Sequence, residues 1–236
     1  MSTVVTVEMQ SAALDRHVSY TAVVPDAGEP PFAVLYQLHG YTDDHRAWLH
    51  RANLLRHLAR WPLVAILPSG ENSYYTGAIE TFVMRDLPAH VRRTFNVRDG
   101  KAAIGGLSMG GYGAIRLGLK YPDRFASIVA HSSRLPARDE LPSLNWTRGL
   151  PLDDLDVDAL ASRAAARPLP RLAFDCGTED HLLADSRRFH ALLTQRNVAH
   201  DYAEHPGAHT WDYWDAHVPR ALELHAAALG LAPATP

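Results

Sequence analysis

Lysine is scarce in this sequence, and positive charge is not concentrated in any part of it. Lys101 and Lys120 are the two lysines among 23 basic residues, and the formal net charge is -3. Nucleic acids and anionic membrane surfaces are bound through clustered positive charge. The composition therefore predicts no nucleic-acid partner and no membrane partner, and it favours a small-molecule ligand. It leaves open whether the chain forms a homo-oligomer.

Cysteine and long apolar runs are scarce as well. Cys176 is the single cysteine, which excludes an intramolecular disulfide framework and a cysteine zinc cluster and suits a reducing compartment. No stretch approaches the roughly 18 consecutive apolar residues of a membrane span. Residues 1–5 lack the charged region and apolar run of a signal peptide. We therefore expect a cytoplasmic protein.

The order of apolar segments predicts the fold class. With 236 residues, 47% of them hydrophobic, we expect one domain over residues 1–236. Apolar, β-branched runs predict strands at residues 4–7, 17–24, 34–38, 63–67, 102–107, 127–130, 172–174 and 199–203. Helical spacing follows at residues 48–59, 82–94, 109–121, 158–166, 181–196 and 211–229. This alternation predicts an α/β fold: a mostly parallel eight-stranded sheet with helices on both faces and an antiparallel first pair of strands.

One long irregular stretch interrupts the alternation, from residue 132 to about residue 156. It contains Pro136, Pro142 and Pro151. A stretch of this length inside a compact domain is more often a functional loop than a plain connection. We expect it to form a short cap over a pocket.

The most informative local pattern is G-x-S-x-G at residues 106–110, where an apolar strand gives way to a glycine-rich helix. A nucleophilic serine on such a sharp turn needs neighbours with almost no side chain, as Gly106 and Gly110 are. Ser108 would then precede a helix N-terminus, where unpaired N–H groups favour developing negative charge. Similar turns occur without serine chemistry, so the motif predicts a nucleophile only together with its partners.

An oxyanion hole needs a second N–H group besides that of Met109, the residue after the serine. The strand at residues 34–38 ends in His39-Gly40-Tyr41, where the glycine lets the backbone turn. We therefore predict the backbone N–H groups of Tyr41 and Met109 as the two donors. His-Gly at the end of a strand is also an ordinary turn when taken alone.

The acid and the base should follow later strands in the order Ser, Asp, His. Asp180 is the predicted acid, although it could be a plain N-cap of the next helix; the neighbouring alternatives are Asp175, Glu179 and Asp185. His209 is the predicted base and is favoured over His205, because it lies after the last strand and before the C-terminal helix. We interpret His200, His217 and His225 as surface histidines.

Two competing chemistries fit poorly. His205 and His209 have the i, i+4 spacing of a zinc-binding helix, but Pro206 and Gly207 between them prevent that helix. Cys176 is a weak candidate nucleophile, because no helix N-terminus follows it immediately to lower its pKa. We predict no metal and no organic cofactor.

These residues resemble the putative-esterase branch of the α/β hydrolases, which includes S-formylglutathione hydrolases, tributyrin esterases, feruloyl esterases and mycolyltransferases. The resemblance covers most of the chain and lies in residues 38–41, 72–75, 106–114, 121–125, 176–180 and 207–211. It implies the α/β-hydrolase fold, a triad of Ser108, Asp180 and His209, and oxyanion donors at Tyr41 and Met109. The segment at 132–156 matches the cap of no single subgroup, so the resemblance does not identify the substrate.

The function expected from the sequence is a serine carboxylesterase that cleaves short-chain or small acyl esters or thioesters through an acyl-enzyme on Ser108. Tyr74, Tyr75 and Trp146 are candidates for substrate binding, because loops at the carboxyl ends of parallel strands surround the ligand in open α/β sheets. Aromatic residues also pack half-buried at loop bases in most proteins. The alternatives are an acyltransferase with the same triad and a non-catalytic binding protein on the same fold.

Overall fold

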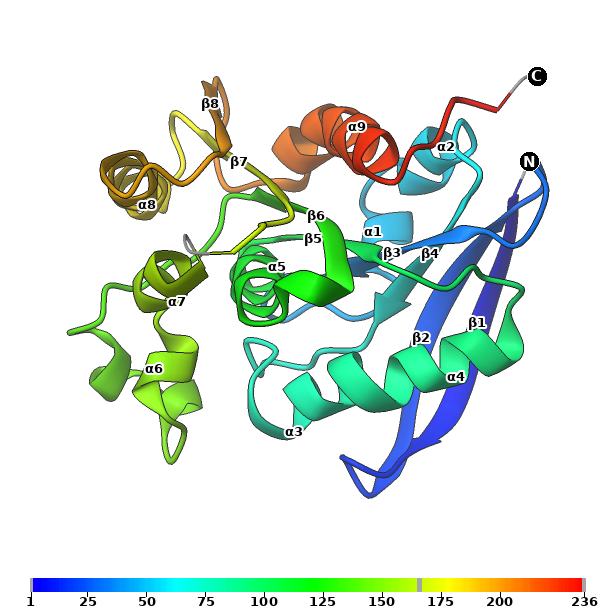
Figure 1. Ribbon diagram of the computed structural model, residues 1–236, viewed down its shortest axis with the longest axis horizontal. Helices are drawn as coiled ribbons and strands as arrows, with labels where there is room; N and C mark the ends of the chain where they lie inside the picture. The colour runs from blue at the N-terminus through cyan, green and yellow to red at the C-terminus, as the bar shows by residue number, and fades with distance from the viewer. Residues whose placement is uncertain (1, 165–166, 235–236) are drawn as a thin grey trace.

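A single mixed sheet organises the chain (Figure 1). The computed structural model describes residues 2–164 and 167–234, and across them the sheet has eight strands in the order β1-β2-β4-β3-β5-β6-β7-β8. The strands are β1 (Ser2–Ser11), β2 (Arg16–Pro25), β3 (Ala33–Leu38), β4 (Leu63–Pro68), β5 (Ala102–Leu107), β6 (Phe125–His131), β7 (Arg171–Gly177) and β8 (Asp201–His205). β1 and β2 pair antiparallel with their neighbours, and the six strands β3 through β8 run parallel to one another. The predicted sheet is confirmed.

The two faces of the sheet are covered by different helices, because successive side chains of a strand point to opposite faces. In β3, Val34, Tyr36 and Leu38 join one apolar cluster, and Ala33 and Leu35 join the other. The first face is covered by α3 (Gly77–Thr81), α4 (Leu87–Thr94), α5 (Met109–Lys120), α7 (Val157–Ala164) and α8 (Leu183–Gln195). The second face is covered by α1 (Ala47–His50), α2 (Leu54–Leu58) and α9 (Trp211–Ala228). Helices therefore lie on both faces, as predicted.

The helix predicted over residues 48–59 is wrong as a single element, because α1 and α2 are separated at Asn53. The backbone N–H of Asn53 donates to Asp215 of α9 (2.7 Å), and its side-chain amide donates to the same carboxylate (2.6 Å). A contact with a distant helix therefore interrupts a segment whose local pattern is helical.

The helix predicted over residues 82–94 begins earlier, with α3. It continues through a π-helical turn, Phe82–Asp86, into α4. The helix predicted over 158–166 corresponds to α7, and its last two predicted residues lie outside the described part of the chain.

The segment of residues 132–156, here called the cap segment, lies beside α5 and α7 (Figure 1). Its first part is fixed to α8, because Asp185 accepts hydrogen bonds from the Arg134 side chain (2.6 Å) and from the backbone N–H of Leu135 (2.9 Å). It contains the short turns Leu141–Ser143 and Asn145–Thr147 and the helix α6 (Leu152–Leu155).

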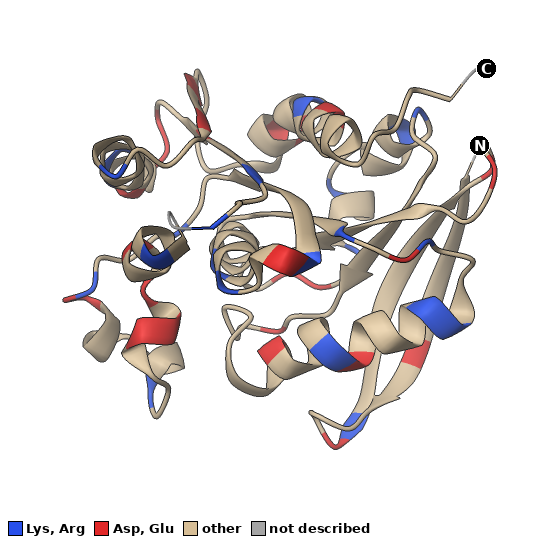
Figure 2. Cartoon of the chain, viewed as in Figure 1, with Lys and Arg blue, Asp and Glu red and all other residues tan. Residues whose placement is uncertain are grey.

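Charges of both signs are interspersed along the chain, as on α9 and along the continuous helix of α3, the π-helical turn and α4 in Figure 2. Such a distribution agrees with the small net charge of -3. Among the helices described, none has the length and apolar character needed to cross a bilayer.

Candidate active site

Ser108 occupies the sharp turn between β5 and α5. Its backbone has φ 53° and ψ -116°, a conformation that residues with a side chain rarely adopt. Its N–H donates to the carbonyl of His131 (2.9 Å), and its carbonyl accepts hydrogen bonds from the N–H groups of Tyr112 (3.0 Å) and Arg134 (3.3 Å). These contacts with α5, β6 and the cap segment hold the serine in its strained conformation.

Gly106 and Gly110 let the strand and the helix approach each other at this turn. A Cβ atom on Gly106 would lie 2.5 Å from the carbonyl oxygen of Gly110, and one on Gly110 would lie 2.6 Å from the carbonyl oxygen of His39. Real Cβ atoms do not make contacts this short, so only glycine fits at either position. The glycines therefore have the role expected from the motif.

The structure brings together the three side chains predicted to form a triad. His209 Nε2 lies 3.0 Å from Ser108 Oγ, and His209 Nδ1 lies 2.9 Å from Asp180 Oδ2 and 3.1 Å from Oδ1. The histidine can donate its Nδ1 proton to the carboxylate and leave Nε2 free to accept the proton of the serine. His209 is in turn packed by Trp214, whose ring meets it edge-on at 4.9 Å.

Asp180 is kept ionised by its hydrogen bonds. Burial raises its pKa, but the hydrogen bonds from His209 and from the backbone N–H of Leu182 outweigh this effect and hold the pKa below its ordinary value. The contact with Leu182 (2.8 Å) closes a short turn before α8, and the N-cap of that helix is Leu182 itself, so Asp180 is not a plain N-cap.

The other carboxylates near the end of β7 are engaged elsewhere. Asp175 lies within β7 and accepts hydrogen bonds from the side chains of His131 (2.7 Å) and Tyr213 (2.8 Å). Asp185 forms an ion pair with Arg134. Among these alternatives, the geometry favours Asp180 as the partner of the histidine.

The loops that carry Asp180 and His209 are joined by hydrogen bonds between Glu179 and Gly207. The N–H of Glu179 donates to the carbonyl of Gly207 (3.0 Å), and the Glu179 carboxylate accepts a hydrogen bond from the N–H of Gly207. A Cβ on Gly177 would lie 2.1 Å from the Gly207 oxygen, so a side chain there would force the loops apart. Glu179 thus supports the site without contacting Ser108.

The two predicted oxyanion donors flank Ser108. Met109 is the first residue of α5, so its N–H has no acceptor within the helix. Gly40 and Tyr41 line the cleft beside Ser108, and a Cβ on Gly40 would lie 3.7 Å from that of Ser108. The Gly40-Tyr41 backbone is therefore close to where a carbonyl oxygen of a bound ester would lie.

His39 and Tyr75 fix this backbone from behind. The Tyr75 hydroxyl accepts a hydrogen bond from the His39 N–H (2.9 Å) and donates one to the His39 carbonyl (3.2 Å). The His39 ring donates Nδ1–H to Gly40 and accepts the N–H of Gly70 at Nε2, each at 2.8 Å. Burial lowers the pKa of His39, which suits this neutral form.

Tyr75 requires a correction as a candidate substrate-binding residue. Its side chain is fully buried and its hydroxyl is used by His39, so it cannot face a ligand. The sequence placed it beside the site correctly but could not show that its hydroxyl is bound to another loop.

Tyr74 and Trp146 remain half-buried and form an aromatic row next to the site. Their rings stack with centroids 4.3 Å apart, and Tyr74 also lies 6.0 Å from the ring of Tyr41, which lines the cleft. Tyr112 packs edge-on against both rings of the stack. The cap segment therefore contributes Trp146 to a wall that continues from Tyr41.

The cleft itself opens over Ser108 and His209, with a volume of about 410 Å³. Its lining is mixed in polarity and includes Thr42, Arg51 and Trp211. The Arg51 guanidinium lies over the Trp211 ring at 5.5 Å. Arg51, which directly follows α1, and Trp211, the first residue of α9, are additions to the predicted site.

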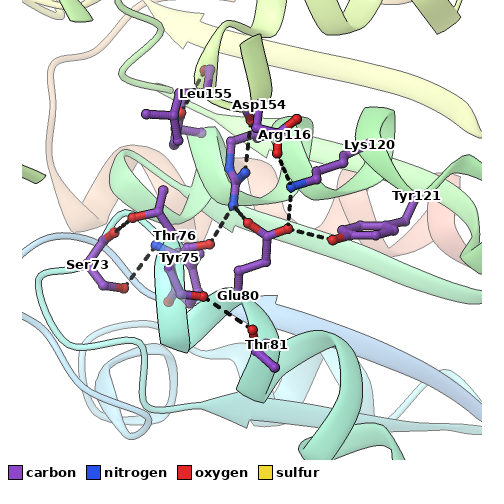
Figure 3. A network of polar contacts seen from close by, with 12 residues as sticks. Ser73, Tyr75, Thr76, Glu80, Thr81, Arg116, Lys120, Tyr121, Asp154 and Leu155 are labelled. Carbon is purple, nitrogen blue, oxygen red and sulfur yellow. Dashed lines mark hydrogen bonds and ion pairs between the residues drawn. The ribbon is translucent and has the colours of Figure 1, made fainter. Parts of the chain in front are cut away.

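A buried ionic cluster ties the cap segment to the rest of the site (Figure 3). Arg116 is fully buried and donates to the carbonyls of Asp154 (2.9 Å) and Tyr75 (2.8 Å) and to the Glu80 carboxylate. Lys120 contacts Glu80 (2.8 Å) and Asp154 (2.9 Å). Burial raises the pKa of Glu80, but the charge of Arg116 and the hydrogen bonds to this carboxylate reverse the shift and lower it.

The predictions for the remaining histidines and for the cysteine can also be compared with the structure. Interpreting His225 as a surface residue was wrong: it is fully buried, it hydrogen-bonds Ser127 (2.7 Å), and burial lowers its pKa to about 3. His200 and His217 are partly buried. Cys176 is buried, and burial raises its pKa to about 12, so its thiol is a poor nucleophile.

Known esterases resemble this chain over nearly its whole length. Residues 11–225 match the family model described as "Putative esterase". An acetyl esterase of Caldicellulosiruptor saccharolyticus is 30% identical, over 92% of this chain and 96% of its own length. The fluorophosphonate-binding serine hydrolase F of Staphylococcus aureus has the same fold, with a TM-score of 0.84, 24% identity and coverage of 94% and 97% of the two chains. An S-formylglutathione hydrolase from the same organism aligns with a TM-score of 0.83, 24% identity and coverage of 94% and 98%.

Proposed function

The chain belongs to the putative-esterase family of α/β hydrolases and is a serine carboxylesterase, and from this premise we propose that Ser108 is its nucleophile, His209 its general base and Asp180 the residue that orients the base. The main support is the continuous chain of hydrogen bonds from Ser108 Oγ through the imidazole to Asp180, at 3.0 and 2.9 Å. The strained backbone of Ser108 adds to it.

The geometry suits a two-step acyl transfer. Ser108 attacks the ester or thioester carbonyl while His209 takes its proton, and His209 then protonates the leaving alcohol or thiol. The N–H groups of Tyr41 and Met109 hold the oxyanion, and each such donor typically contributes roughly 3–4 kcal/mol of transition-state stabilisation. Water cleaves the acyl-enzyme by the same route. Asp180 holds the imidazole in the correct tautomer and stabilises its charged form.

The proposed substrates are small esters or thioesters with a short acyl group. The cleft over Ser108 is about 410 Å³, and the stacked rings of Tyr74 and Trp146 occupy the space on the cap side. A long acyl chain would need this stack to open. The relative from C. saccharolyticus is an acetyl esterase, which agrees with a small acyl group.

Hydrolysis is favoured over transfer to an alcohol, because an open cleft with polar side chains such as Thr42 and Asp43 admits water readily. Family membership also favours the enzyme over the non-catalytic binding protein. Product analysis with an added acceptor alcohol would detect transfer. For the compartment we propose the cytoplasm, since a lone, buried Cys176 suits reducing conditions; cell fractionation tests this.

The decisive experiment is hydrolysis of p-nitrophenyl esters from acetate upward by the wild type and by Ser108→Ala. We expect the variant to keep only the residual rate that binding and the oxyanion hole supply, at least about 10³-fold below wild type. A fluorophosphonate should add its mass to the wild type and not to Ser108→Ala.

Ser143→Ala is the matched control, because Ser143 is an exposed serine of the cap segment. It should keep both activity and labelling. Wild-type rates or labelling in Ser108→Ala would show that the nucleophile is another residue.

A further inference from the structure

His181 places a second imidazole beside the Asp180–His209 pair. Its Nδ1 lies 3.6 Å from Asp180 Oδ1, and its ring centre lies 4.7 Å from that of His209. The His181 side chain is 69% exposed, so solutes can reach it, whereas the Asp180 carboxylate is buried. The mechanism proposed above gives His181 no role.

The three side chains form a ligand set typical of a transition metal. One atom from each of Asp180, His181 and His209 lies within 4.8 Å of the other two, and no other three His, Cys, Asp or Glu residues within 2–164 and 167–234 do so. In a tetrahedral zinc site, ligand atoms about 2.0–2.1 Å from the ion are about 3.4 Å apart. Asp180 Oδ1 is already 3.6 Å from His181 Nδ1 and 3.1 Å from His209 Nδ1. The ligand atoms of the two imidazoles lie within 4.8 Å of each other, so a movement of the exposed His181 side chain toward His209 would complete the geometry.

We propose that Asp180, His181 and His209 bind Zn²⁺, with water as the fourth ligand, and that the bound ion inhibits the esterase. The inhibitory part rests on the assignment of His209 as general base. Imidazole nitrogen suits Zn²⁺, whereas Mg²⁺ and Ca²⁺ prefer sites made of oxygen ligands. We therefore expect Zn²⁺ to inhibit the enzyme and Mg²⁺ and Ca²⁺ to leave it active.

The inhibition follows from the two nitrogens of one ring. In the bond to Asp180, Nδ1 of His209 carries the proton and Nε2 carries the lone pair that faces Ser108. Zn²⁺ needs the lone pair of Nδ1, so the proton leaves that atom and Nε2 takes one up from solvent. The neutral ring still has one proton, but Nε2 now presents N–H to Ser108 and cannot accept the proton of the serine. The ion also removes Asp180 as the orienting partner.

The first test is calorimetric titration of the metal-free protein with ZnCl₂ at neutral pH. Wild type should show one tight site, and His181→Gln should weaken it by roughly 10-fold or more through loss of a ligand. His190→Gln is the matched control, because His190 also contacts another histidine, His200 (2.8 Å), in a pair without a carboxylate. It should leave the tight site unchanged. Co²⁺ should give the visible absorption of a tetrahedral site in wild type and not in His181→Gln.

The second test is hydrolysis of p-nitrophenyl acetate with ZnCl₂, each variant being normalised to its own metal-free rate. Zn²⁺ should lower kcat of wild type and of His190→Gln, EDTA should restore it, Mg²⁺ should have no effect, and His181→Gln should resist roughly 10-fold higher Zn²⁺. Equal Zn²⁺ binding or equal inhibition in wild type and His181→Gln would overturn the proposal. If Ser108→Ala hydrolyses esters normally, the proposed function fails instead, and the titrations still decide whether the metal site exists.

Discussion

Ser108 has a backbone conformation that glycine would adopt with less strain. Its φ of 53° is retained because three backbone partners fix the residue. We predict that Ser108→Gly is more stable than Ser108→Ala by about 1 kcal/mol in unfolding free energy and therefore unfolds at a higher urea concentration. Both variants lack the hydroxyl, and only alanine keeps the strain. Both variants should be nearly inactive. Equal stability of the two in urea would show that the turn is unstrained.

In the proposed mechanism, Asp180 acts on the reaction through His209. Asp180→Asn keeps an oxygen that can accept the Leu182 N–H but can no longer favour the tautomer with the proton on Nδ1. We predict a fall in kcat of about 10⁴-fold with little change in the thermal midpoint. Steady-state kinetics on p-nitrophenyl acetate measure kcat, and thermal unfolding followed by circular dichroism measures the midpoint. A fall of less than about 10-fold would rule out Asp180 as the orienting acid.

Tyr75 supports the predicted oxyanion loop through its hydroxyl. Tyr75→Phe leaves the buried N–H and carbonyl of His39 without this partner, so we predict a loss of about 1–3 kcal/mol in unfolding free energy. Because the Gly40-Tyr41 backbone loses its support, kcat should fall more than KM changes. Tyr74→Phe is the control, and it should change neither stability nor kcat by a comparable amount.

The residues of the predicted triad could be found from the sequence because each follows a recognisable strand in a fixed order. The roles of Tyr75 and His225 could not, because they depend on partners far along the chain. Tyr75 bonds to His39 and His225 bonds to Ser127, and neither pair has a local signal. Residue type indicates that a polar group needs a partner but does not identify it.

At the scale of elements, we propose that the cap segment limits the size of the acyl site through Trp146. Trp146→Ala removes one member of the stack with Tyr74 and opens space on that side. We predict that the preferred p-nitrophenyl ester shifts to a longer acyl chain, with kcat/KM for butyrate or hexanoate rising relative to acetate.

The control for this prediction is Arg148→Ala, at an exposed position of the same segment. It should keep the wild-type preference. If Trp146→Ala also keeps it across the series, the stack does not limit the acyl chain.

The sequence predicted whether most segments are strands or helices, but it did not predict the residues at which they begin and end. Each predicted strand exists, but β8 runs two residues later than predicted, at Asp201–His205. The predicted helix at 48–59 is broken at Asn53 by Asp215, 162 residues away in sequence. Periodicity measures the apolar face of a segment, whereas the ends depend on hydrogen bonds from other elements.

At the scale of the whole molecule, the class of the fold could be predicted and the order of its strands could not. Alternating strands and helices imply a parallel sheet. The order in which β4 lies between β2 and β3 depends on which buried strands pair, and fully buried strands such as β3 and β4 carry little pattern that would specify this.

Stability of the whole chain should depend on pH through the buried cluster around Arg116. The folded pKa of Glu80 is lowered, so its contribution is present above its unfolded pKa of about 4.3 and is lost as pH falls through the folded value. We predict that Glu80→Gln destabilises the protein by about 3–5 kcal/mol near pH 7, because Arg116 loses its buried partner.

Urea unfolding from neutral pH down to about pH 3, below the ordinary pKa of a glutamate, measures this effect. The variant should lose less stability than wild type as the pH falls, so the two curves converge. Parallel curves would show that Glu80 is not ionised in the folded protein.

During synthesis of the chain, the loops after β7 and β8 can pair only after the second of them has been made. β8 is the last strand and has one neighbour, β7, so the loop with His209 reaches Asp180 only when this edge strand has docked. A nascent chain on the ribosome exposes Ser108 about a hundred residues before its base is synthesised. Until residues 201–209 have been synthesised and β8 has docked on β7, the serine therefore lacks its proposed general base, and esterase activity reports that this edge of the sheet is closed.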